Sequence, residues 1–295
     1  MQCVLGHTAT DICYSLIQLR ENFMKKNKTN IILVIIFLIG LSVMLYPSFS
    51  NYWNSMVQSK AVAGYNNAVQ KMSQVDYDEM FHAAEEYNSA LLNVDRPFEN
   101  YESISGYDDI LNVSGTGIIG YVTIDRIKVE LPIYHGTSEG VLQIGVGHLG
   151  GSSFPIGGIG THSVLSAHRG LPSAKLFSNL DEMEVGDTFQ ITVLNRVLTY
   201  QVDQIRIVEP EDVDELLIDP NKDLCTLMTC TPYGINTHRL LVRGVRVDSD
   251  VNSYVPTDAY QVEPNIVAVG SMLVILSALL VITCCTRIVK RKKKL

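Results

Sequence analysis

Two long apolar runs near the ends of the chain constrain its organisation more than any other feature. Residues 31–49 read IILVIIFLIGLSVMLYPSF and residues 266–285 read IVAVGSMLVILSALLVITCC, and neither run contains a charged side chain. About twenty apolar residues are needed for a helix to cross the hydrocarbon core of a bilayer. The sequence therefore predicts transmembrane helices at 31–49 and 266–286. A cleaved signal peptide is the alternative for the first run, but the run is long for one and no small-residue cleavage site follows Tyr46.

Basic residues flank the two runs on the sides that face the chain ends. Residues 25–28 contain three lysines, and residues 287–294 contain six lysines and arginines. Because basic residues accumulate on the cytoplasmic side of membrane proteins, we expect a cytoplasmic segment at 1–30 and a basic cytoplasmic tail at 287–295. The region between the two spans is then extracellular, and the protein is expected at the cell membrane.

The first 23 residues fit this organisation poorly. Met24 is followed at once by the lysine cluster and then by the apolar run, which is the usual order at the start of a membrane protein. We therefore hypothesise that Met24 is the true initiator.

Charge is distributed unevenly along the chain. Residues 51–265 carry 29 of the 31 acidic residues but only 13 of the 23 basic ones, which gives this region a net charge of −16. Recognition of nucleic acid requires a basic surface that neutralises phosphates. The extracellular region is therefore not expected to bind nucleic acid.

Residues 50–116 form the first extracellular segment. Between residues 52 and 93 there is no proline and one glycine, and apolar residues such as Val57, Ala61 and Tyr65 recur at a helical period. We expect a helical arm here, with a spacer between the membrane and the rest of the extracellular region as its simplest role.

From residue 117 the sequence changes to short β-rich runs separated by glycine and proline. Seven runs are candidate strands: GIIGYVTI, IKVELPI, HSVLSAH, DTFQITVL, RVLTYQVDQIRIV, DLCTLMTC and HRLLVRGVRV. Many short strands at such spacing favour a β-sandwich or a closed barrel at 117–247. Short surface helices are expected at 171–183 and 211–218, and a polar linker at 248–265 leads back to the membrane.

Only two of the six cysteines lie in the extracellular region, Cys225 and Cys230. They are five residues apart in a predicted strand, so their side chains should point to opposite faces. A disulfide between them would need a sharp local bend. We expect two free thiols, with Cys225 as a packing residue.

Cys230 is the candidate nucleophile. It ends a predicted strand, His168 is available elsewhere as a base, and Arg239 is available as a donor to a developing oxyanion. His162 and His238 are expected to be structural. The sequence contains no HExxH or CxxC motif, so we expect no metal site and no cofactor.

Three separated motifs resemble one known family. They are TLMTC at 226–230, SAHRG at 166–170 and NTHRLLVRG at 236–244. Together with the surrounding text and the two apolar runs, they are similar to the class C, pilus-assembling sortases of Gram-positive bacteria. The resemblance implies a mainly β fold: a sortase-type closed β-barrel with short surface helices, an N-terminal helical arm and two transmembrane helices.

The resemblance also implies an activity, that of a membrane-anchored cysteine transpeptidase. Cys230 would cleave an LPxTG-like sorting signal between Thr and Gly and hold the substrate as an acyl-thioester. His168 would act as general acid and then as base, and Arg239 would bind the substrate and stabilise the oxyanion. The partners would be pilin or surface-protein precursors, with a pilin lysine as acceptor of an isopeptide bond.

Two other functions stay open at this point. One is a housekeeping-type sortase that anchors proteins to the cell wall or hydrolyses them. The other is a membrane-tethered adhesion domain without catalytic activity.

Asp95, Pro97 and Phe98 resemble the Asp-Pro-aromatic lid that covers the active site in class C sortases. Arg96 separates the aspartate from the proline, which departs from the family pattern. A lid would shield the thiol with the aromatic ring and pair the carboxylate with Arg239 or His168. An ordinary polar turn with a proline stop is the alternative.

Overall fold

The structure, a computed structural model, describes residues 5–248 and Leu273, with side chains from Ile32 onward. The described residues divide into two units, with the boundary between Pro47 and Ser48. The first helix, α1 (Leu5–Val69), contributes its beginning to one unit and its end to the other. The predicted second span, the linker beyond Asp248 and the basic tail lie outside the described residues, Leu273 excepted.

The predicted first span lies within α1. Its large apolar side chains are exposed, for example those of Ile36 at 61% and Phe49 at 67%. Within the part of the chain that the structure describes, this is the one helix long and apolar enough to cross a membrane, with a mean hydropathy of 2.5 over its most apolar window. A membrane anchor and a signal sequence share this composition.

The second unit is built on a closed β-barrel, which confirms the mainly β prediction. Around the barrel the strands follow the order β1, β2, β3, β4, β7, β8, β6, β5, and β5 pairs with β1 to close it. Neighbouring strands are antiparallel except in two pairs, β2 with β3 and β4 with β7, which are parallel. The strand bounds are β1 Ile118–Ile124, β2 Val129–His135, β3 Val146–His148, β4 Thr161–Ser166, β5 Thr188–Val193, β6 Arg196–Val208, β7 Asp223–Thr231 and β8 His238–Val247.

All seven predicted runs form strands. The strand that was not predicted, β3, has three residues, too few for an alternating pattern. Its neighbour α4 (Glu139–Ile144) was not predicted either, since six residues cannot display a helical period.

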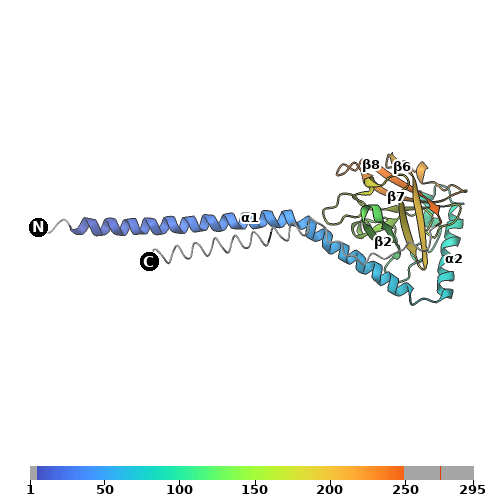
Figure 1. Cartoon of the computed structure of the whole chain (residues 1–295), viewed down its shortest axis with the longest axis horizontal. Coiled ribbons are helices and arrows are strands. Elements are labelled where there is room, and N and C mark those ends of the chain that lie inside the picture. The colour runs from blue at the N-terminus through green and yellow to red at the C-terminus, as the bar shows by residue number, and fades with distance from the viewer. Residues whose placement is uncertain (1–4, 249–272, 274–295) are drawn as a thin grey trace. The chain divides into compact units, whose positions relative to one another are not determined.

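The arm is not a spacer, and that expectation was wrong. The end of α1 and the helix α2 (Gln74–Leu91), which starts with a capping box between Ser73 and Asp76, pack their apolar faces against the barrel (Figure 1). The following residues of the two helices belong to the same hydrophobic cluster as the barrel interior: Tyr65, Val69, Phe81, Ala84, Tyr87 and Leu91. The barrel and the arm therefore share one core.

The predicted helices at 171–183 and 211–218 are reduced to single turns, Leu180–Glu182 and Asp214–Leu216. In the first segment the backbone amides are engaged by distant partners. Lys175 N donates to Asn51 Oδ1 and Phe177 N donates to the carbonyl of His168, so a regular helical ladder cannot form there.

Tyr65 joins the arm to the barrel through its hydroxyl group. The hydroxyl donates to Ile119 O (3.1 Å) and accepts from Leu194 N (2.8 Å), and the residue is 1% exposed. We expect Tyr65→Phe to lower the free energy of unfolding by about 1–3 kcal/mol, because the buried Leu194 N–H loses its partner. Denaturant unfolding of the full chain in detergent measures this effect. Tyr52→Phe, at a 39% exposed position of α1, is the control, and equal stabilities of the two variants would contradict the role of Tyr65.

Candidate active site

The two thiols of β7 lie on opposite faces of the strand, as the sequence predicts. Cys225 and Leu227 belong to the barrel core and are 0% exposed, whereas Met228 packs in a second cluster outside it. Strand alternation places Cys230 on the same outer face as Met228. Both cysteines are free, and Cys230 is half-buried.

The environment of Cys225 suits a packing residue. Complete burial raises the pKa of its thiol well above the ordinary value, and the nearby carboxylate of Asp223 raises it further. Since the thiolate is the reactive form of cysteine, Cys225 is held as an unreactive thiol.

Arg239 lies directly opposite Cys230. The antiparallel register of β7 and β8 pairs Cys230 with Arg239 and Met228 with Leu241. Residues that face each other in this way have Cβ atoms about 5 Å apart and project from the same face. Arg239 Nη1 contacts the carbonyl oxygen of His238 at 3.2 Å, and Arg239 forms no ion pair with any described residue.

His168 follows β4, the other neighbour of β7. The parallel register pairs Ser166 with Met228, and beyond it Ala167 N donates to Met228 O (3.1 Å). The hydroxyl of Thr229 then donates to Ala167 O (2.8 Å). If this register is continued by two residues, His168 is expected beside Cys230 on the outer face.

A carboxylate that sequence reasoning missed accompanies His168. Glu139, the first residue of α4, places Oε2 3.5 Å from His168 Nε2, a buried atom that makes no hydrogen bond. The pKa of Glu139 is lowered first by the hydrogen bond from the Gln143 amide and then by the electrostatic interaction with His168. No local motif links two residues 29 positions apart, so this contact could not be predicted from the sequence.

The two other candidate histidines have structural contacts. His162 is buried, with Nδ1 2.9 Å from Leu217 O and Nε2 2.7 Å from Thr226 Oγ1, and burial lowers its pKa. His238 pairs with Glu209 at 3.2 Å. Neither histidine is joined to Cys230 by any contact among the described residues.

The predicted lid residues behave differently from one another. Phe98 lies in the short helix α3 (Pro97–Asn100) and packs on the outer cluster that includes Met228 and Leu241. Met228 and Leu241 are paired two residues along β7 and β8 from the pair Cys230 and Arg239. Asp95 makes no contact with Arg239 or His168; its carboxylate is 93% exposed and lies 3.8 Å from Arg96 Nε. The inserted Arg96 has a positive φ of 49°. Its Nη1 donates a hydrogen bond to Glu99 Oε2 at 2.9 Å.

Two consecutive glycines, Gly150 and Gly151, lie in close contact with the segment that contains Phe98. A Cβ atom on Gly151, whose φ is +87°, would lie 2.4 Å from the carbonyl oxygen of Pro97. A Cβ atom on Gly150 would lie 2.4 Å from the ring of Tyr101. Side chains at these two positions would therefore displace the segment that carries Phe98.

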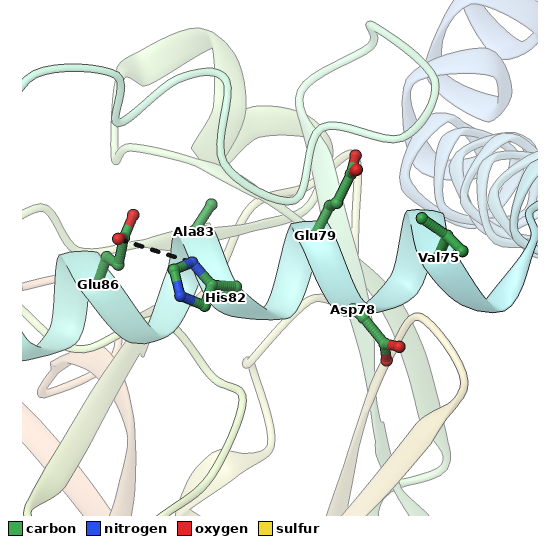
Figure 2. A pocket seen from close by; sticks show the side chains of 6 residues that line it. All are labelled: Val75, Asp78, Glu79, His82, Ala83 and Glu86. Carbon is green, nitrogen blue, oxygen red and sulfur yellow. Dashed lines mark ion pairs between the residues drawn. The ribbon is translucent and has the colours of Figure 1, made fainter.

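An open hollow of about 540 Å³ lies along α2, away from these residues. Figure 2 shows that its carboxylates diverge: Glu79 and Asp78 point to opposite sides, and Glu86 pairs with His82 at 3.6 Å. Among the residues that the structure describes, no three His, Cys, Asp or Glu side chains gather as metal ligands. The hollow is therefore a solvated helix face.

Comparison with known proteins identifies the family. Residues 122–247 match the model of the sortase domain. The crystal structure of sortase C1 from Streptococcus agalactiae is 48% identical and superimposes with a TM-score of 0.60, covering 65% of this chain and 100% of that one. The chain belongs to the sortase family, in class C.

Two further relatives show the range of similarity. Sortase C of Streptococcus pneumoniae, solved in work on catalysis and pilin substrate specificity, is 45% identical to this sortase with a TM-score of 0.58, over 64% of this chain and 97% of that one. Sortase D of Bacillus subtilis (strain 168) is 31% identical over 131 residues, which are 43% of this chain and 63% of that protein. This sortase thus spans less than two thirds of that curated relative.

The positions of the two thiols predict different reactivity. We expect a methanethiosulfonate reagent to modify Cys230 in the folded protein while Cys225 stays unmodified, because Cys225 is fully buried and its raised pKa keeps it protonated. Peptide mapping by mass spectrometry distinguishes the two sites, and the unfolded protein is the control in which both react. Equal modification of both cysteines in the folded protein would contradict the assignment of faces.

Proposed function

We propose that this sortase is a membrane-anchored cysteine transpeptidase that cleaves an LPxTG-like sorting signal between Thr and Gly and joins pilin subunits through a lysine isopeptide bond. One observation carries the proposal. Cys230 in β7 is paired with Arg239 in β8, and His168 follows β4, the other neighbour of β7. A nucleophile, a proton donor and a fixed positive charge are the groups that acyl transfer requires.

In the first half of the reaction, the thiol proton of Cys230 passes to His168, and the sulfur attacks the carbonyl carbon of the signal's threonine. The carbonyl oxygen becomes an oxyanion, which the guanidinium of Arg239 stabilises with a planar pair of donors. The C–N bond then breaks, His168 gives a proton to the departing glycine amine, and the acyl group stays on sulfur as a thioester.

In the second half, the amine of a pilin lysine attacks the thioester carbonyl. His168, now neutral, accepts a proton from the amine, and a second tetrahedral oxyanion forms beside Arg239. The C–S bond breaks, Cys230 leaves as thiolate, and an isopeptide bond joins the two subunits. Water in place of the lysine would give hydrolysis.

Membership of class C favours pilus assembly over wall anchoring or simple hydrolysis. The similarity to a sortase C structure studied for pilin substrate specificity points the same way. A tethered adhesion domain without activity is disfavoured because all three reactive side chains are present.

The apolar part of α1 supports attachment to the membrane. It contains no charged residue from 31 to 49, its large apolar side chains are exposed, and lysines precede it. We infer that this segment is an uncleaved anchor, that a second anchor lies at 266–286, and that the barrel works outside the cell.

Replacing the two cysteines one at a time tests the nucleophile. We expect Cys230→Ala to abolish both peptide cleavage and polymer formation, since no acyl-enzyme can form. Cys225→Ala, on the same strand but facing the core, should keep turnover near wild type and lose only stability. Mass spectrometry of the enzyme incubated with an LPxTG-type peptide, with and without a lysine acceptor, measures each step. Residual acyl-enzyme in Cys230→Ala, or equal inactivity of Cys225→Ala, would refute the assignment.

The contacts of the Phe98 segment predict which residue closes a lid. Phe98→Ala should speed modification of Cys230 by a methanethiosulfonate reagent about fivefold, because losing a half-buried ring removes about 1 kcal/mol from the closed state. Asp95→Ala is the control and should leave the rate unchanged, since its carboxylate contacts only Arg96. Stopped-flow kinetics gives both rates. The opposite ranking would mean that the carboxylate, and not the ring, holds the segment.

A further inference from the structure

Three amide side chains form a stripe on the barrel-facing side of α1. Asn51, Asn54 and Gln58 are spaced three and four residues apart, which places them on one face of the helix. The same face continues into Tyr65 and Val69, which belong to the core. Polar residues on a face that is otherwise buried require hydrogen-bond partners.

Each amide contacts a backbone group of a loop or helix end far away in the sequence. Asn51 Oδ1 accepts from Lys175 N at 2.8 Å, and Asn54 Nδ2 donates to Ser173 O at 2.7 Å. Gln58 Nε2 donates to Ile144 O at 3.0 Å. Asn51 and Asn54 therefore fix the segment 173–175, and Gln58 satisfies a carbonyl at the end of α4, which the helix itself leaves without a partner.

These targets lie on the two sides of His168. The loop 169–178 folds back on His168, because Phe177 N donates to His168 O (3.2 Å) and Gly170 N donates to Ser178 Oγ (3.1 Å). On the other side, α4 begins with Glu139, whose carboxylate is 3.5 Å from His168 Nε2. Cys230 and Arg239, in contrast, are held in paired strands and have no contact with this stripe.

We propose that Asn51, Asn54 and Gln58 are positioning residues for His168. The inference rests on the proposed transpeptidase function. His168 follows the end of β4, and α1 fastens the two segments that flank it, in addition to the hydrogen bond that Arg169 Nη1 donates to Thr231 Oγ1 of β7. Proton transfer requires donor and acceptor to be placed within tenths of an ångström, so loosening these segments slows the chemical step without weakening peptide binding.

The opposite hydrogen-bonding roles of the two asparagines give a sharp test. Asn51→Asp keeps the acceptor that Lys175 N needs, whereas Asn54→Asp replaces a donor with an acceptor that faces the carbonyl of Ser173. In the full chain in detergent, we expect Asn54→Asp to lower kcat for an LPxTG-type peptide about tenfold with KM nearly unchanged. Asn51→Asp should stay within about twofold of wild type. Asn67→Asp, the same substitution at an exposed position of α1, is the matched control.

A second readout does not depend on activity. Amide hydrogen exchange of the segment 169–178 should rise in Asn54→Asp and in Asn54→Ala, and stay at the wild-type level in Asn51→Asp and Asn67→Asp. If all four variants match wild type in kcat and exchange, or if the two aspartate variants of the stripe are equally impaired, the positioning role is refuted. A wild-type enzyme that cleaves no sorting peptide would refute the proposed function instead, while the exchange comparison would still decide whether the stripe holds the loop.

Discussion

The parallel pairing of β4 with β7 is the constraint on which the candidate site depends. It runs through six residue pairs and continues through the hydrogen bonds of Ala167 to β7, which carries His168 to the level of Cys230. Parallel strands cannot be joined by a tight turn, so the chain between them forms β5, β6 and their loops before it returns. A slip of one residue in β7 would turn Cys230 toward the core and bring Cys225 outward, which would remove the thiol from Arg239.

The barrel depends on the arm for its core. The hydroxyl of Tyr65 in α1 bonds Ile119 of β1 and Leu194 after β5. The side-chain amide of Asn88 in α2 accepts from Phe154 N at 2.7 Å and donates to Phe154 O at 3.3 Å. Phe154 in turn stacks on His148 at a centroid distance of 4.8 Å, beside the turn that receives the Phe98 segment. The arm therefore fixes the barrel and the loops around the site together, and this is why a helix that looks like a spacer in the sequence is part of the catalytic domain.

Features that repeat locally were predictable from the sequence, and features that depend on distant contacts were not. Alternation identified seven strands and the opposite faces of Cys225 and Cys230, because both follow from the two-residue period of a strand. The arm's helices were expected from their period, but their docking depends on partners in β1 and the loop after β5. The contact of Glu139 with His168 and the exposure of the Asp95 carboxylate also depend on the whole fold and not on a local pattern. The inserted Arg96 lies nearer to the carboxylate of Asp95 than any charged group of the barrel does.

The site combines parts of two different kinds. Cys230 and Arg239 are fixed by strand pairing, so their relative position follows from the register alone. His168 and Phe98 lie on segments outside the strands, where backbone hydrogen bonds must come from elsewhere. The loop after His168 obtains them from Asn51 and Asn54 of α1, which bond Lys175 N and Ser173 O, and the Phe98 segment lies against Gly150 and Gly151, where the absence of side chains leaves room. The fold therefore supports the candidate site in two ways: strand pairing sets Cys230 opposite Arg239, and contacts from outside the sheet hold the segments that carry His168 and Phe98.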